Sequence, residues 1–94
     1  MDINDHHNFF VKVLNGMCYI NITNAPYEMT TTQYQMIAPN GLPKPKNAFY
    51  ANAINGGNVA EGLLILIETD GSATLLTMST GLKGVISSFT YLLA

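Results

Sequence analysis

The sequence predicts one small all-β domain, an antiparallel β-sandwich of jelly-roll-like architecture. Short runs rich in β-branched, aromatic and aliphatic residues recur along the 94 residues. Turn-forming dipeptides separate these runs at intervals of roughly ten residues, a pattern typical of a sandwich or barrel. No stretch keeps a helical period, because two adjacent glycines interrupt the only candidate, 52–64. An immunoglobulin-type core is disfavoured, since the chain has no tryptophan and a single cysteine.

The first hairpin is predicted from the dipeptide Asn15-Gly16, which separates strand-like runs over 9–14 and 17–23. Two β-prone runs joined by Asn-Gly favour a type I′ turn, because that turn needs φ > 0 at both central residues. The second run alternates between apolar and more polar side chains, which indicates one buried face and one wet face. The residues expected to be buried are Cys18, Ile20 and Ile22.

The second hairpin is predicted from Asp70-Gly71, between runs over 62–69 and 72–79. Its first strand contains the uninterrupted apolar run 63–67. A strand without alternation is typically covered on both faces. We therefore expect it to be the central strand of the domain or to face a neighbouring subunit.

Three further strands are expected, over 34–38, 48–54 and 84–93. Pro39 ends the first of them, because proline cannot donate to the ladder. The segment 41–47, with Lys44 and Lys46, is interpreted as a solvated loop. Alternation along 48–54 predicts two faces, one with Phe49, Ala51 and Ala53 and the other with Tyr50, Asn52 and Ile54.

The composition points to a neutral surface. Hydrophobic residues make up 48% of the chain and charged residues only 11%, whereas a typical soluble domain has about 25% charged residues. Either Asn, Thr, Ser and Gly cover the surface, or apolar surface is buried between subunits. The net charge of −2 and the lack of arginine argue against nucleic acid. No apolar run is long enough for a membrane span.

Residues 1–8 are expected to form a separate N-terminal segment, and 9–94 a single domain. The segment contains the two histidines, His6 and His7, which a strand would send to opposite faces. Cys18 has no second cysteine with which to form a disulfide, so we expect a buried, inert thiol. The sequence predicts no metal site and no cofactor.

No catalytic residue is predicted, and the chain is expected not to be an enzyme. A small hydrolase would need two carboxylates to converge in a cleft. The candidates are Glu28, Glu61, Glu68 and Asp70, of which Asp70 is already explained as a turn residue.

A ligand site is predicted where neutral polar and aromatic residues gather at one strand-to-turn junction: Tyr50, Asn52, Asn55 and Asn58. Amides and a tyrosine can hydrogen-bond to and stack on an uncharged sugar. The alternative interpretation is that these are ordinary solvent-face and turn residues.

Four stretches, taken in order, carry a resemblance to a known family: VLNGMCYINIT, MIAPNGLPKPKNAFYANAI, GLLILIETDGSATLL and GLKGVISSFTYLLA. Together they are similar to the C-terminal head domain of phage tail-fibre and baseplate receptor-binding proteins of Gram-positive hosts. The resemblance spans about residues 9 to 94.

The resemblance implies a homotrimer at the tail tip or fibre of a virion, in contact with other tail or baseplate proteins. It also implies attachment to a host-surface saccharide such as a cell-wall glycan. The saccharide sites of that family often use Trp, Arg, His or Asp, of which Trp and Arg are missing from this chain. A purely structural domain that trimerises the baseplate or fibre tip, without any ligand, is the alternative.

Overall fold

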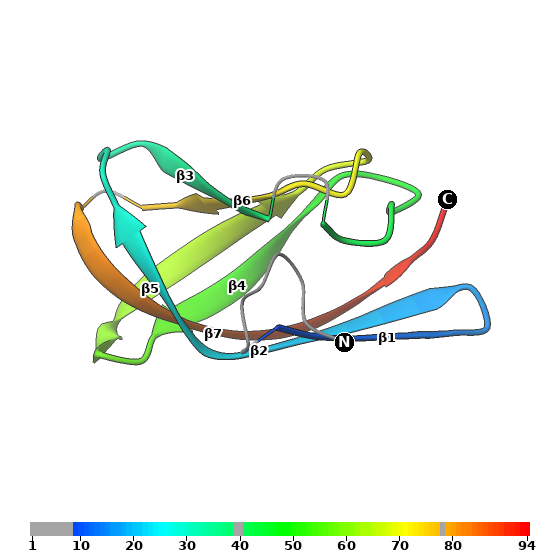
Figure 1. The fold of residues 1–94 in the computed structure, drawn as a ribbon, viewed down its shortest axis with the longest axis horizontal. Helices are drawn as coiled ribbons and strands as arrows, with labels where there is room; N and C mark the ends of the chain where they lie inside the picture. The colour runs from blue at the N-terminus through cyan, green and yellow to red at the C-terminus, as the bar shows by residue number, and fades with distance from the viewer. Residues whose placement is uncertain (1–8, 39–40, 78) are drawn as a thin grey trace.

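The computed structural model describes residues 9–38, 41–77 and 79–94, while the side chains of 58–60 lie outside that description, as do His6 and His7. The described chain forms strands that pair in antiparallel fashion (Figure 1). They are β1 (Phe9–Leu14), β2 (Met17–Met29), β3 (Tyr34–Ala38), β4 (Phe49–Asn55), β5 (Asn58–Ile67), β6 (Ala73–Leu76) and β7 (Gly81–Leu92).

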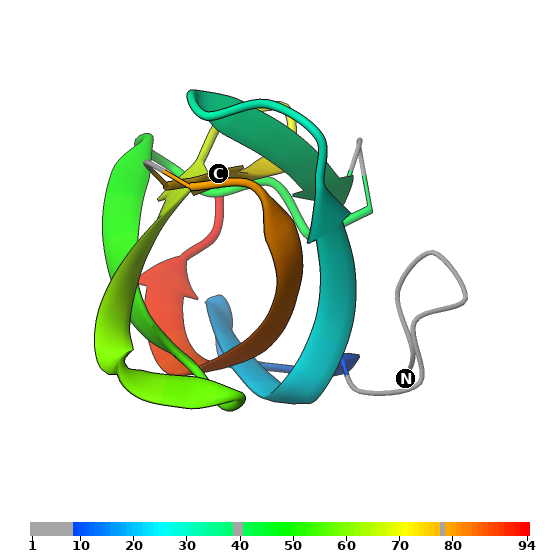
Figure 2. The same ribbon diagram turned by 90° about the vertical axis from the view of Figure 1, so that its left-hand side faces the viewer.

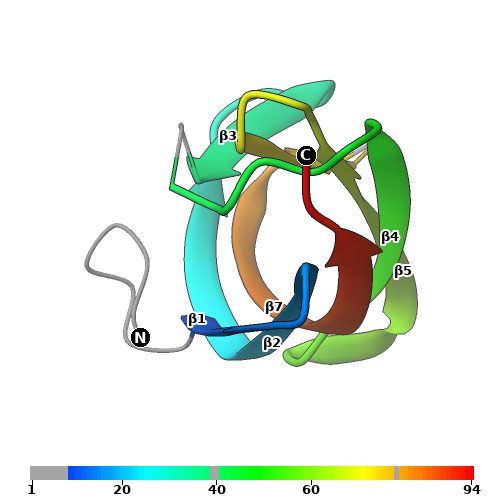
Figure 3. The same cartoon turned by 90° about the vertical axis from the view of Figure 1, so that its right-hand side faces the viewer.

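The strands belong to one seven-stranded sheet in the order β1-β2-β7-β4-β5-β6-β3. The sheet curls around a central interior, as the two end-on views in Figures 2 and 3 show. The all-β antiparallel class predicted from sequence is therefore confirmed. The opposing layers expected of a sandwich are opposite walls of this single curled sheet.

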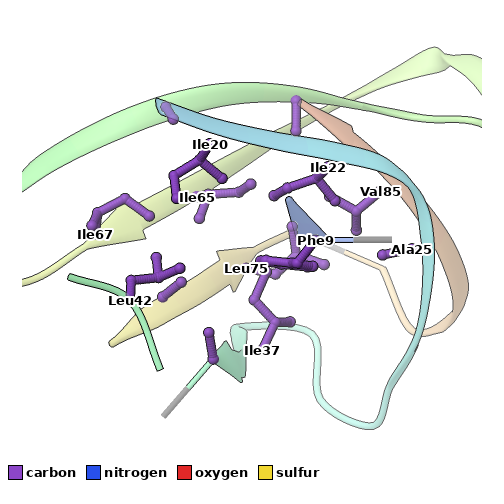
Figure 4. Packing of buried hydrophobic residues seen from close by; sticks show 14 of the residues in the cluster. Phe9, Ile20, Ile22, Ala25, Ile37, Leu42, Ile65, Ile67, Leu75 and Val85 are labelled. Atoms are coloured by element: carbon purple, nitrogen blue, oxygen red, sulfur yellow. The ribbon is translucent and has the colours of Figure 1, made fainter. Parts of the chain in front are cut away.

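The core fills the space inside the curl. Figure 4 shows its aliphatic side chains pointing toward one another from several strands. Phe9 and Tyr27 pack edge to face, with 6.2 Å between ring centroids, a favourable aromatic geometry. Cys18 is fully buried, as expected, and burial raises the pKa of its thiol. The largest side chains with almost no exposed surface include Phe9, Ile20, Ile22, Ile37, Ile65, Ile67 and Leu75.

Strand β2 is longer than the predicted run 17–23, because its pairing with β7 continues past a β-bulge between Ile22 and Ala25. Asn24 lies in the bulge and has φ = 54°, a left-handed conformation that asparagine tolerates better than most residues. After the bulge, pairing with β7 resumes down to Met29. A bulge bends its strand, so β2 contributes to two parts of the curled sheet.

The predicted type I′ turn is present at the first hairpin, where Asn15 and Gly16 have φ of 53° and 75°. The second hairpin exists, but its turn differs from the prediction. The N–H of Gly71 donates to the carbonyl of Glu68 (2.9 Å), and the N–H of Glu68 donates to Ser72 (3.0 Å). Only Gly71 has positive φ (85°). These bonds define a longer loop with glycine at its left-handed position.

The segment 41–47 is only partly the solvated loop that was predicted, because some of its side chains are buried. Lys44 and Lys46 are exposed, but Leu42 retains only 4% of its surface and enters the core (Figure 4). The Tyr91 hydroxyl donates to the carbonyl of Pro43 (2.8 Å), and Pro45 bridges Leu93. The loop thus closes one end of the curled sheet.

The apolar run 63–67 lies in β5, between β4 and β6. Its inward side chains, Leu63, Ile65 and Ile67, are buried. Leu64 and Leu66 point outward and are only half-buried. The strand is interior to the sheet, although β4 holds the middle position. The described chain therefore covers one face of the run fully and the other only in part.

Candidate functional site

The four predicted ligand residues do not share one surface. Tyr50 and Asn52 lie on the outer face of β4, with Tyr50 62% exposed. Asn55, at the end of the strand, is 5% exposed and points inward, because side chains alternate along a strand. The side chain of Asn58 lies outside the described residues. The structure thus brings Tyr50 and Asn52 together and separates Asn55 from them.

Asn55 completes the sheet at the end of the β4–β7 ladder. Its Oδ1 accepts hydrogen bonds from the backbone N–H groups of Gly57 (3.1 Å) and Gly84 (3.0 Å). Its Nδ2 donates to Oε2 of Glu61 (2.9 Å). The amide of Asn55 therefore replaces backbone pairing where the two strands separate, and it positions the Glu61 carboxylate.

Glu61 is the centre of a polar network. Lys83, which is 4% exposed, donates from Nζ to Glu61 Oε1 (2.8 Å) and to Ser79 Oγ (2.7 Å). Ser79 and Thr77 also donate to Glu61 Oε1, at 2.9 and 3.3 Å. The hydrogen bonds from Lys83, Asn55 and Ser79 lower the pKa of Glu61 to about 2. A buried ammonium group needs such a partner, because an unpaired one would be strongly destabilising.

Sequence reasoning missed this network, although one signal was available. Val85, Ser87 and Tyr91 are buried on the inner side of β7. Extending their alternation by two residues toward the N-terminus places Lys83 inside as well. A lysine at an inward position predicts a carboxylate partner. The partner itself could not be found, since Glu61 is 22 positions away in the chain.

The network has the residue types of a nucleophile and a base, but its electrostatics favour a structural role. The Nζ of Lys83 is engaged by two oxygens, Glu61 Oε1 and Ser79 Oγ, and by the ion pair with Glu61. Glu61, with a pKa of about 2, is a very weak base at neutral pH.

The four carboxylates proposed for a hydrolase do not converge as a group, although Glu68 and Asp70 lie close together and both accept hydrogen bonds from Ser72. Glu68 and Asp70 lie on the β5–β6 turn, Glu61 near the other end of β5, and Glu28 is exposed on β2. Within the described part of the chain, no group of three His, Cys, Asp or Glu residues could hold a metal ion.

A hollow of about 410 Å³, termed the end hollow, lies beside this network. The side chain of Asn24 fills the space over Gly56 and Gly84, where a Cβ atom on either glycine would overlap its Oδ1. The amide of Asn55 and the carboxylate of Glu61 also line the hollow, but both are engaged in the network described above. Its polar groups are thus largely committed to one another.

Two smaller hollows lie on the outer face of the sheet. One, of about 280 Å³, is lined by Asn52 together with Asn21 and Ser88. The other, of about 220 Å³, shares Asn21 and Ser88 and adds the rings of Phe10 and Tyr19. Asn52 was singled out from sequence, whereas its neighbours on β2 and β7 were not. Their proximity depends on the strand order, which local patterns do not reveal.

No family model matches the chain, and neither a curated protein nor a solved structure is similar enough to register as a match. Among the described residues, no helix is long and apolar enough to cross a membrane.

Proposed function

We propose that this protein is a non-enzymatic attachment and assembly module that acts as a homotrimer at the tail tip or fibre of a phage, where it contacts a host-surface saccharide. Two kinds of support underlie the proposal. The sequence resembles receptor-binding head domains over most of its length, and one outer part of the sheet has the character of a subunit interface.

That part is the outer aliphatic face, formed by Tyr34, Met36, Leu64, Leu66 and Leu76. Cross-strand pairing places Leu76 between Leu64 and Tyr34, and Thr74 between Leu66 and Met36. Tyr34 and Met36 are 59% and 49% exposed, while Leu64, Leu66 and Leu76 are half-buried. This face is the observation that carries the proposal.

A second copy of the chain is the partner that fits this face best. The five residues carry no charge, so the face offers nothing to steer a charged ligand, and apolar surface of this kind is buried in stable oligomers. A closed ring of identical subunits covers each copy and leaves none exposed. Burying the face between copies also accounts for the low charged fraction of the sequence.

Tyr50 and Asn52 are exposed on β4, but they lie directly beside the outer aliphatic face, because they pair with Leu66 and Leu64. The saccharide contact is therefore assigned to the outer surface of β1, β2 and β7, on the other side of β4 from that face. Aromatic rings beside uncharged hydroxyl and amide groups suit a neutral sugar. The alternative is a structural domain that trimerises the appendage and binds nothing. No feature of the outer aliphatic face distinguishes the two.

Sedimentation equilibrium at micromolar concentration tests the assembly, and a trimer mass is expected. A purified monomer at that concentration would contradict the proposal. An array of bacterial cell-wall glycans then separates the two functions. Specific retention of the trimer supports attachment, whereas a trimer that retains no glycan supports the structural alternative.

A further inference from the structure

We propose that the outer groove, formed by Phe10, Tyr19, Asn21, Ser88 and Thr90, binds one uncharged sugar ring of a glycan. The inference rests on the proposed attachment function and assigns it a site on β1, β2 and β7. The groove contains neither Tyr50 nor Asn52, the exposed residues that the sequence suggested, although Asn52 lines an adjoining hollow that shares Asn21 and Ser88.

Strand register builds the groove. Asn21 of β2 pairs with Phe10 of β1 on one side and with Ser88 of β7 on the other. Two positions along, Tyr19 pairs with Lys12 and with Thr90. Directly opposed side chains have Cβ atoms about 5 Å apart, and diagonal ones remain within reach of an aromatic ring. Six side chains therefore form a grid on one surface.

The chemistry of the grid matches a pyranose. Phe10 and Tyr19 are 46% and 44% exposed, so each presents ring surface on which the apolar C–H face of a sugar can pack. Asn21 supplies both amide donors and an acceptor, and the hydroxyls of Ser88 and Thr90 donate and accept. None of the five carries a charge. The only charged member of the lining is Lys12, at the β1 edge.

The size of the groove favours a small occupant. Its volume of about 220 Å³ is below the roughly 300 Å³ at which pockets for drug-sized ligands begin. A second copy of the chain is the less suitable occupant, because hydroxyls and an amide buried at an interface would each need a partner. The outer aliphatic face carries less of that cost, because Leu64, Leu66, Leu76 and Met36 have no hydrogen-bonding group that needs a partner and only Tyr34 of its five members has a hydroxyl. The groove therefore suits a sugar, and the aliphatic face suits the subunits.

The test is a titration of the full ¹⁵N-labelled chain with three free sugars, D-glucose, D-galactose and N-acetyl-D-glucosamine, each followed by amide chemical shifts. At least one sugar is expected to shift the amides of Tyr19, Asn21, Ser88 and Thr90. Tyr19→Ala should weaken that binding about fivefold, because an aromatic contact contributes on the order of 1 kcal/mol. Tyr50→Ala, which removes an exposed ring outside the groove, should leave it unchanged.

Asn21→Ala and Thr90→Val provide independent variants if Tyr19→Ala does not fold, and both should weaken the same titration. The site is wrong if none of the sugars shifts these amides, if the variants bind as the wild type does, or if Tyr50→Ala alone abolishes binding. It is also wrong if Tyr19→Ala changes the sedimentation mass, since the groove would then be a subunit contact. Glycan retention by the wild-type trimer in the array would still support attachment, so the two failures are distinguishable.

Discussion

Gly71 and Leu42 are in contact so close that a Cβ atom on Gly71 would overlap the carbonyl oxygen of Leu42. The N–H of Leu42 also donates to the carbonyl of Gly71 at 3.0 Å. The β5–β6 turn thereby holds the loop that places Leu42 in the core. Glycine is required at this position for two separate reasons, its φ of 85° and the absence of a side chain.

Gly71→Ala is therefore expected to destabilise the fold more than Gly16→Ala. Both residues have positive φ, which an alanine adopts at a cost of about 1 kcal/mol. A Cβ at Gly16 would meet nothing within 4 Å, so that substitution should cost only the backbone term. Gly71→Ala must also displace Leu42, and a total of about 2 kcal/mol or more is expected. Urea unfolding of both variants measures the difference, and equal losses would contradict this account.

Gly84→Ala is expected to be destabilising because of the Asn24 side chain. A Cβ at Gly84 would overlap Asn24 Oδ1. Asn24→Gly removes the side chain that would overlap this Cβ, and glycine adopts φ = 54° readily. The double variant should therefore lose less stability than the sum of the two single ones, a coupling that a double-mutant cycle detects. Gly62→Ala is the matched control, since nothing lies within 4 Å of its Cβ position. Strict additivity would disprove the contact.

Glu61→Gln should change how stability depends on pH. The ordinary pKa of the carboxyl is 4.5, and its hydrogen bonds lower it to about 2 in the folded chain. The ionised form is favoured by folding, so the stabilisation is complete above pH 4.5 and is lost as the pH falls toward 2. The stability difference between wild type and Glu61→Gln should therefore shrink over that interval. Denaturant unfolding at several pH values measures it.

Lys83→Met offers an independent check on the same pair. Without the ammonium group, the pKa of Glu61 should rise toward its ordinary value, and ¹³C chemical shifts of the Glu61 carboxyl report it. A pKa of Glu61 that stays unchanged in Lys83→Met would show that the ion pair is not its main cause.

Leu64→Glu and Leu66→Lys test the outer aliphatic face. Each places a charge on the half-buried outward side of β5. If the face is buried between copies, an unpaired charge there costs several kcal/mol after relaxation, and the variants should dissociate or fail to fold. Leu14→Glu is the matched control, because Leu14 is 50% exposed at the tip of the first hairpin and outside the face. Folded Leu64→Glu with an unchanged sedimentation mass would remove this interface.

Local patterns in the sequence placed the strands but not all of their ends, since β6 is shorter than the predicted run 72–79 and β7 begins three residues before the predicted 84. The ranges 9–14 and 34–38 coincide with β1 and β3, and the alternation expected along β4 is present. What could not be predicted depends on contacts between distant residues. The bulge at Asn24 is fixed by packing on Gly56 and Gly84. The loop 41–47 has a polar, proline-containing sequence from which the burial of Leu42 could not be predicted.

The site was harder to predict than the strands for the same reason. Alternation correctly separates Tyr50 and Asn52 from the inner face of β4, but proximity in sequence grouped them with Asn55, which points inward. The neighbours of Asn52 are Asn21 and Ser88. They become adjacent only because β7 lies between β2 and β4, and no short-range pattern specifies that order.

The position of β7 also determines when the chain can fold during its synthesis. This strand pairs with both β2 and β4, yet it is the last of the seven to leave the ribosome. Before then, only the β1–β2 hairpin and the β4–β5–β6–β3 strands can pair, as two separate ribbons whose edges toward β7 are open. Such edges are prone to pair with other chains. Nascent copies made on one messenger are therefore most vulnerable to wrong association in the interval before residues 81–92 emerge.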